Sequence, residues 1–134
     1  MIVTQTLAEG QRRALAPLCA VVLDPGGHPI AMLRADGASI NRPEIATAKA
    51  AGCLAMGFGG RELARRAQTM PQFFAALISV LPQGIIPVPG GVLIRGEGDR
   101  LLGAVGVSGD ASDNDEICAL AGIAEAGLQA DTGE

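Results

Sequence analysis

One histidine and one lysine stand out among the residues of this sequence that could do chemistry. His28 is the only histidine, and it directly follows the turn-forming residues 24–27 (DPGG). Its imidazole could act as an acid or base or bind a metal, or it could simply hydrogen-bond the backbone of the turn. One histidine is too few for a self-contained zinc site.

Lys49 is the only lysine, and it lies within a nearly all-apolar stretch, residues 43–56, that we predict to be a helix. A lysine there must either extend to solvent or find a carboxylate partner, for which Asp36 and Glu116 are the candidates. It could bind an anionic ligand, act as a base if its pKa is lowered, or form a structural ion pair. The sequence leaves these alternatives open.

Glycine-rich segments form a third group of candidates. Arg34, Asp36, the pair Gly90 and Gly91, and residues 106–109 are expected to line one end of a sheet. Backbone N–H groups there could hold a carboxylate or phosphate, although structural turns would have the same composition. The Walker and GxGxxG patterns are absent, and Ser108 lies in GVSGD rather than in a GxSxG elbow, so a triad of Ser108, His28 and an aspartate is disfavoured.

Composition excludes several classes of protein. The net charge is −4, with no Trp or Tyr and three Phe, which disfavours nucleic-acid binding. No apolar run is long enough for a membrane span, and no secretory signal precedes the first elements, so we expect a cytoplasmic protein. The three cysteines form no CxxC pair and are expected to be buried free thiols. Many glycines and few aromatics limit the area each residue buries, which favours a homo-oligomer.

The elements that must position these residues follow from periodicity and turn signals. We predict a single α+β domain over residues 1–134, with a mostly antiparallel sheet of two hairpins flanked by helices. The expected strands are residues 16–23, 29–34, 92–95 and 101–107, and the expected helices are 4–15, 43–56, 61–68, 71–80 and 113–130. The last helix should bury a stripe of Ile117, Leu120, Ala121, Ala124 and Leu128, and residues 131–134 should fray.

Several of these segments together resemble a known family. Residues 24–28 (DPGGH) with 34–38 (RADGA), the helical segment 45–50 (IATAKA), and residues 89–94 (PGGVLI) with 103–109 (GAVGVSG) are similar to motifs of the GlcG/HbpS-like family, as are residues 115–116 (DE) and 121–122 (AG). That family includes haem-binding proteins and the C-terminal domain of PduO-type proteins. Two departures are a shorter N-terminal helix and Leu93 where the family commonly has proline.

The resemblance implies a profilin-like α/β sandwich that assembles into dimers, tetramers or octamers. It also implies a small-molecule ligand, most plausibly haem or a similar planar anionic compound, bound between the turn at His28, the Lys49 helix and the glycine-rich loops at a subunit interface. His28 would then be the iron ligand. The other expected ligand contacts are Arg34, Lys49, Gly90, Gly91, Gly106, Ser108 and Gly109.

Two alternatives stay open. One is a cofactor-independent enzyme acting on a small oxygenated metabolite, in which Lys49, Asp36 and His28 perform acid–base chemistry. The other is a structural oligomeric subunit that binds no ligand.

Overall fold

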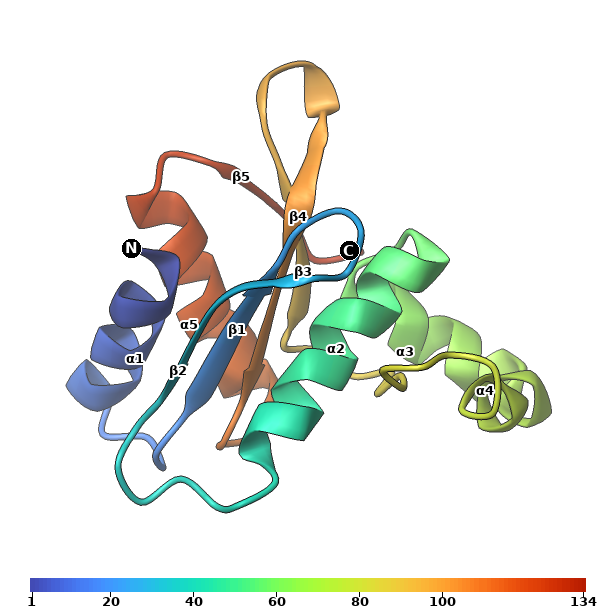
Figure 1. Ribbon diagram of the computed structural model, residues 1–134, viewed down its shortest axis with the longest axis horizontal. Helices are drawn as coiled ribbons and strands as arrows, with labels where there is room; N and C mark the ends of the chain where they lie inside the picture. Colours follow the sequence, from blue (N-terminus) through green and yellow to red (C-terminus); the bar gives the residue numbers. More distant parts are fainter.

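A computed structural model describes residues 1–134 and shows an α+β fold built on one open, five-stranded antiparallel sheet. The order along the sheet is β2-β1-β4-β3-β5 (Figure 1). The strands are β1 (Cys19–Leu23), β2 (Pro29–Arg34), β3 (Gly91–Arg95), β4 (Leu101–Ser108) and β5 (Gln129–Asp131). The two predicted hairpins, β1–β2 and β3–β4, are therefore confirmed and lie side by side through β1 and β4.

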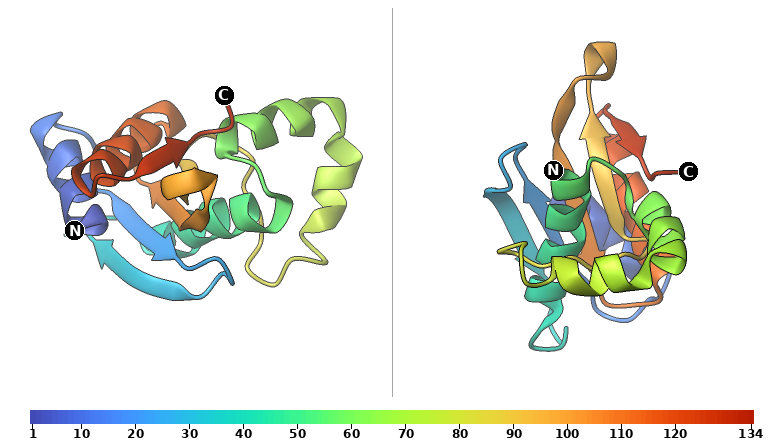
Figure 2. Two further views of the ribbon diagram at one scale, coloured as in Figure 1. Left: turned by 90° about the horizontal axis from the view of Figure 1, so that it is seen from above. Right: turned by 90° about the vertical axis from the view of Figure 1, so that its right-hand side faces the viewer.

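Helices cover both faces of the sheet. They are α1 (Ile2–Arg12), α2 (Arg42–Met56), α3 (Gly60–Thr69), α4 (Pro71–Leu77) and α5 (Ser112–Glu125). Helices α1 and α5 pack together on one face and α2 lies across the other, while α3 and α4 extend away from the sheet (Figures 1 and 2). None of these helices is both long and apolar enough to span a bilayer.

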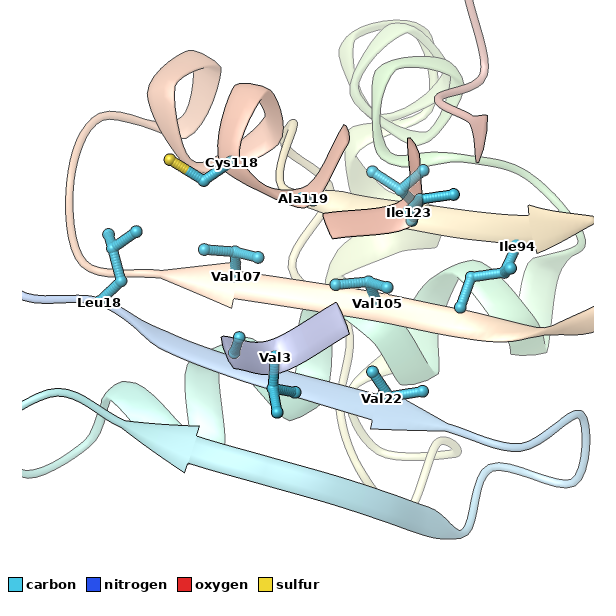
Figure 3. Close-up of a cluster of buried hydrophobic side chains, with 11 residues drawn as sticks. Val3, Leu18, Val22, Ile94, Val105, Val107, Cys118, Ala119 and Ile123 are labelled. Carbon is cyan, nitrogen blue, oxygen red and sulfur yellow. The ribbon is translucent and has the colours of Figure 1, made fainter. Parts of the chain in front are cut away.

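The core has two halves, one on each side of the sheet. The half under α1 and α5 contains Val22, Val105, Val107 and Ile123 (Figure 3). The half under α2 contains Val21, which follows the opposite face of the same strand. All of β1 is buried for this reason, whereas β2 at the sheet edge is largely exposed.

The C-terminal part of the chain differs from the prediction. Helix α5 ends at Glu125, because Gly127 adopts a left-handed φ of +73° and turns the chain back toward the sheet. The following residues form β5 and pair with β3, so the prediction of a helix to residue 130 and a frayed tail was wrong. The Thr132 carbonyl accepts a hydrogen bond of 2.9 Å from the Arg61 N–H, which fastens the tail to the start of α3.

The predicted buried stripe of α5 was also wrong, because the helix is rotated relative to it. Ile117 is exposed, and Leu120 and Leu128 are only partly buried against the core. The buried residues of the helix are instead Asp115, Glu116, Cys118, Ala119, Gly122 and Ile123. A buried aspartate on this side is tolerated because it meets a lysine, as described below. Smaller differences are that α1 begins and ends earlier than predicted and α4 stops at Leu77.

Candidate functional site

The turn between β1 and β2 holds His28 at the surface. One Asp24 carboxylate oxygen accepts hydrogen bonds from the backbone N–H groups of Gly26, at 2.9 Å, and His28, at 3.0 Å. The Asp24 N–H in turn donates to the His28 carbonyl at 2.8 Å. The His28 side chain is exposed and its ring makes no hydrogen bond, so the turn is fixed by its backbone while the imidazole stays free to bind a ligand.

A small hollow lies beside this turn. It has a volume of about 190 Å³ and is formed by the turn, the C-terminal half of α2 and the loop after α4. Its lining residues are Pro25, Gly26, Gly27, Ala51, Leu54, Ala55, Leu81, Pro82, Gln83 and Gly84. This volume is below the roughly 300 Å³ at which pockets for drug-sized ligands begin, so the hollow can seat only the edge of a large flat ligand.

A second hollow, of about 400 Å³, continues along β2. It is lined by Met32, Pro43, Glu44, Thr47, Pro82 and Gln83. Both hollows have Pro82 and Gln83 in their lining, so they are neighbours between β2 and α2, and we call the two together the β2 trough. The expected position between the turn and the Lys49 helix therefore contains a real depression, although Lys49 itself does not line it.

Lys49 points into the protein instead. Its Nζ donates to the Val107 carbonyl at 2.9 Å and to Asp115 Oδ2 at 3.1 Å, and only 4% of the residue is exposed. The partner is thus Asp115, and the two predicted candidates, Asp36 and Glu116, were wrong. Burial raises the pKa of Asp115, while the Asp110 N–H and Lys49 oppose that shift.

A sequence signal for this pair exists. Asp115 precedes Cys118 and Ala119 by about one helical turn, so it lies on the same side of α5 as those buried residues. A carboxylate on an apolar helix side and a lone lysine in an apolar helix each need a partner of opposite charge.

The predicted glycines serve close packing in this structure. A methyl group at Gly90 would lie 2.9 Å from Lys49 Nζ, and one at Gly91 would lie 2.6 Å from the Lys49 carbonyl oxygen. One at Gly106 would overlap the Ala46 carbonyl oxygen, and one at Gly109 would overlap Pro17. Other parts of the protein fill these positions. Gly91 and Gly106 allow the backbone of α2 to lie close to β3 and β4, Gly90 leaves room for the Lys49 side chain, and Gly109 lies against the segment before β1.

Ser108 and Arg34 lie at the end of the sheet opposite to His28. Ser108 is buried and its hydroxyl accepts a hydrogen bond of 2.8 Å from Arg42. Arg34, the last residue of β2, is exposed and reaches the Ala38 carbonyl at 3.5 Å. At about 3.3 Å per residue, β2 separates His28 from Arg34 by roughly 20 Å. The structure therefore brings Lys49, Gly90 and Gly91 together but leaves His28 apart from them.

Asp36 lies on the turn after β2, beside a groove that sequence reasoning missed. This groove, of about 480 Å³, runs between α1 and β2. It is lined by Thr4, Leu7, Ala8, Gly10, Gln11, Leu15, Ala16, Pro17, Leu18, Leu33, Ala35 and Asp36. The sequence signal was the apolar side of the first predicted helix, since Leu7, Ala8 and Leu15 line the groove.

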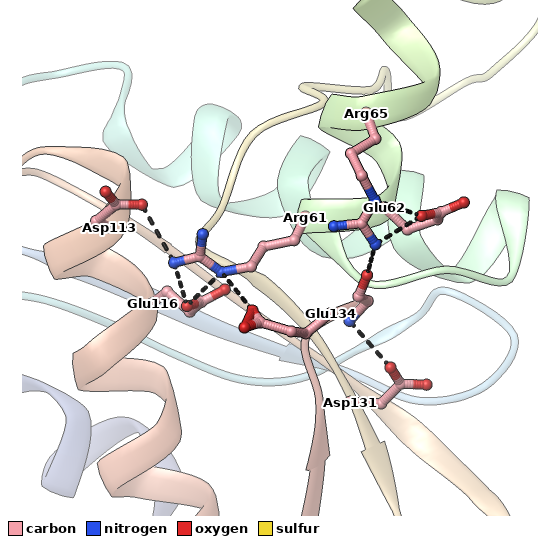
Figure 4. Close-up of polar contacts among 8 residues, drawn as sticks. Arg61, Glu62, Arg65, Asp113, Glu116, Asp131 and Glu134 are labelled. Atoms are coloured by element: carbon pink, nitrogen blue, oxygen red, sulfur yellow. Dashed lines mark hydrogen bonds and ion pairs between the residues drawn. The ribbon is translucent and has the colours of Figure 1, made fainter.

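A further charged cluster surrounds Arg61 at the start of α3 (Figure 4). Arg61 donates two hydrogen bonds to Glu116 Oε1, at 3.0 and 2.8 Å, and one to Asp113 at 3.2 Å. The hydrogen bond to Glu116 raises the pKa of Arg61. The second Glu116 oxygen is buried without a partner. The cluster joins α3 to α5, and no group of three or more His, Cys, Asp or Glu side chains is arranged to hold a metal ion.

The comparisons with known proteins agree with this fold. The family model described as haem degrading protein HbpS-like matches residues 1–124. A comparison with curated proteins gives no match.

Three solved structures are similar over most of their length. A double mutant of HbpS from Streptomyces reticuli is 25% identical, with a TM-score of 0.78 over 92% of this chain and 80% of that one. Protein ORFY of Klebsiella pneumoniae is 26% identical, with a TM-score of 0.75 over 92% and 86%. A complex of PduOC with haem is 22% identical, with a TM-score of 0.83 over 99% and 93%, and shows the likeness of fold alone. On its sequence and its fold, this chain belongs to the HbpS-like family.

Proposed function

We propose that this protein binds haem or a similar planar anionic ligand, with His28 as the iron ligand. The observation that carries the proposal is the His28 ring, which is exposed and free of hydrogen bonds and directly follows Gly26 and Gly27, two residues that line the β2 trough. A neutral imidazole is a common axial ligand of haem iron. Membership of the HbpS-like family supports a haem-related ligand at the level of the family.

The residues around His28 fit one edge of such a ligand. Pro25, Leu54 and Leu81 supply apolar surface in the hollow next to the turn that carries His28. Bound haem would supply an iron centre able to exchange electrons and bind small molecules. Carboxylates on the ligand need a cation, and Lys49 is held in its pair with Asp115. Arg34 is the exposed cation on β2, but it lies at the opposite end of that strand from His28 and does not meet a ligand held by His28 of the same chain.

The acid–base alternative has no such support from the geometry. It requires Lys49, Asp36 and His28 to act on one substrate, and within one chain these side chains lie in separate places. Lys49 is buried under Gly90, Asp36 lies beside the α1–β2 groove, and His28 lies at the other end of β2.

Self-association is the second part of the proposal. Large apolar side chains are exposed on β2, on the turn after it and around α4, among them Ile30, Met32, Ile40, Phe73 and Val80. Such side chains favour burial against another protein surface. A haemin titration of the purified protein, followed by its Soret band, tests ligand binding directly. We expect saturation near one haem per chain, and a titration without saturable binding would overturn the proposal.

A further inference from the structure

The outer edge of β2 is prepared for pairing with another strand. The Ala35 N–H donates to the Leu18 carbonyl at 2.9 Å, and the alternation of an antiparallel ladder then directs the backbone groups of Met32 and Arg34 away from β1. The side chains of Ile30 and Met32 are 64% and 54% exposed. Natural edge strands are commonly protected by charged residues, proline or a covering segment. In β2 the proline and the charged residue stand at the two ends, Pro29 and Arg34, and the four residues between them are apolar.

The opposite edge of the sheet is different. Strand β5 has only three residues, and the chain after it folds over the start of α3. The Arg95 guanidinium also bonds the Asp131 carboxylate at 3.0 Å across this edge. Strand β2 is therefore the edge that is long, apolar and open (Figure 1).

The proposed ligand site is incomplete within one chain. His28 precedes the first residue of β2 and Arg34 is the last, roughly 20 Å away. A haem bound through its iron to His28 does not reach that guanidinium with its carboxylates. When a second copy pairs with β2 in the antiparallel direction, its strand runs the opposite way. The end of β2 that carries Arg34 in one copy then lies beside the end that carries His28 in the other.

We propose that two copies of this chain pair antiparallel along β2 about Met32, and that the ligand held by His28 is completed by the partner subunit's Arg34. In this register Ile30 lies opposite the partner subunit's Arg34, which is then about 7 Å along the strand from the level of His28. This inference rests on the proposed ligand at His28, but the pairing itself can be tested without any ligand.

Charge and shape both favour a second copy as the occupant of this edge. Arg34 is the only charged residue of β2. Pairing about Met32 places the two Arg34 guanidinium groups at opposite ends of the paired strands, each opposite Ile30 of the other copy. Met32 also lines the β2 trough, so the troughs of the two copies meet at the axis. The two-fold arrangement thereby joins two small hollows into a longer one with a histidine and an arginine at each end.

The pairing is tested by a cysteine at the axis. In Met32→Cys, the two Cα atoms of a hydrogen-bonded pair lie about 5.5 Å apart, which suits a disulfide. The native thiols do not interfere, since all three are buried and burial raises the pKa of Cys53 to about 12 and of Cys118 to about 11. We expect rapid oxidation of Met32→Cys to a covalent dimer, whereas Glu97→Cys on the distant β3–β4 turn forms no covalent dimer. Equal rates for the two variants would overturn the pairing.

A second variant tests the same pairing without a new cysteine, so its result does not depend on how a cysteine affects the edge strand. Met32→Lys places two ammonium groups opposite each other and should convert the dimer to a monomer in sedimentation velocity. Glu97→Lys, at an exposed residue on the β3–β4 turn, should leave the dimer intact. A dimer that persists in Met32→Lys, or is lost equally in Glu97→Lys, would also overturn the pairing.

The shared ligand site is tested by complementation. Arg34→Glu should weaken haemin binding about tenfold or more, as expected for one lost charge-assisted contact, and His28→Ala should abolish the Soret shift. When the two variants are refolded together, mixed dimers contain one intact site, so about a quarter of the wild-type sites should return. No recovery, with wild-type protein binding haemin normally, would contradict the shared site. A wild-type protein that cross-links through residue 32 yet binds no haemin would refute the proposed ligand and leave the pairing standing.

Discussion

Lys49 Nζ lies 3.1 Å from Asp115 Oδ2, and the two side chains are 4% and 1% exposed, respectively. The pair joins α2 to α5 beside β4, because the Lys49 ammonium also bonds the Val107 carbonyl. The other Asp115 oxygen accepts the Asp110 N–H at 3.0 Å, so the carboxylate is bonded on both oxygens. Lys49, which the sequence offers as a possible base, thus holds together α2 and α5, the helices on either side of the sheet.

Removing one member of this pair should be strongly destabilising. In Lys49→Met the carboxylate of Asp115 stays buried without its cation, which costs about 3–5 kcal/mol. The double variant Lys49→Met with Asp115→Leu should lose less than the sum of the single variants, because no unpaired charge remains. Urea unfolding of the four proteins measures the coupling. Additive losses would show that the ion pair does not carry this stability.

Asp110 should make stability depend on acid. Hydrogen bonds from Asn114 and from the N–H groups of Ala16 and Ala111 lower the pKa of Asp110 below its ordinary value of 3.8. The folded state therefore favours the carboxylate, and this contribution is present above pH 3.8 and disappears as the pH falls through the lowered pKa. Asp110→Asn should be less stable than wild type at pH 6, and the difference should shrink below pH 3.8. A difference that does not change with pH would contradict this account.

Gly106 should not tolerate a side chain. A methyl group there overlaps the Ala46 carbonyl oxygen, so Gly106→Ala must push α2 away from β4, at a cost of about 3 kcal/mol. Gly57→Ala is the matched control: its left-handed φ of +80° costs about 1 kcal/mol, but no atom lies near the added methyl. Thermal or urea unfolding separates the two. Equal losses would mean that α2 can shift without penalty.

Arg61 and Glu116 should show strong coupling. Arg61→Ala leaves a nearly buried carboxylate without its hydrogen-bond donor, and a bond of this kind stabilises by roughly 2 kcal/mol. Glu116→Gln in the same chain removes the buried charge and should recover part of that loss. A double-mutant cycle in urea measures the coupling, and a value near zero would indicate that solvent replaces Arg61 at this position.

Much of the architecture was readable from local sequence. Turn residues and apolar runs placed β2 at Pro29–Arg34 as found, and they predicted both hairpins. The C-terminal strand was missed because three polar and small residues after a glycine carry no periodic signal, and their pairing with β3 depends on the whole fold. Long-range register decides such pairings, and local propensity does not.

The candidate site was less readable. Composition identified His28 and Lys49 as unusual, but the distance between them in the structure depends on the length of β2. The pairing of Lys49 with Asp115 depends on the rotation of α5 about its own axis. The glycines illustrate the same point. A glycine-rich segment can be a loop that binds an anion or a strand that packs closely against a helix, and the two have the same composition. The close approach of α2 to Gly106 distinguishes them, and it exists only in three dimensions.

The most direct test of the central claim is a haemin titration of wild-type protein beside His28→Ala, with Glu97→Ala on the distant β3–β4 turn as a control. The His28 ring makes no hydrogen bond, so its removal should leave the unfolding midpoint unchanged and isolate its effect on the ligand. We predict saturable binding with a Soret shift in wild type and in Glu97→Ala, and loss of that shift in His28→Ala. Identical Soret spectra and affinities in all three proteins would contradict the assignment of His28 as the iron ligand.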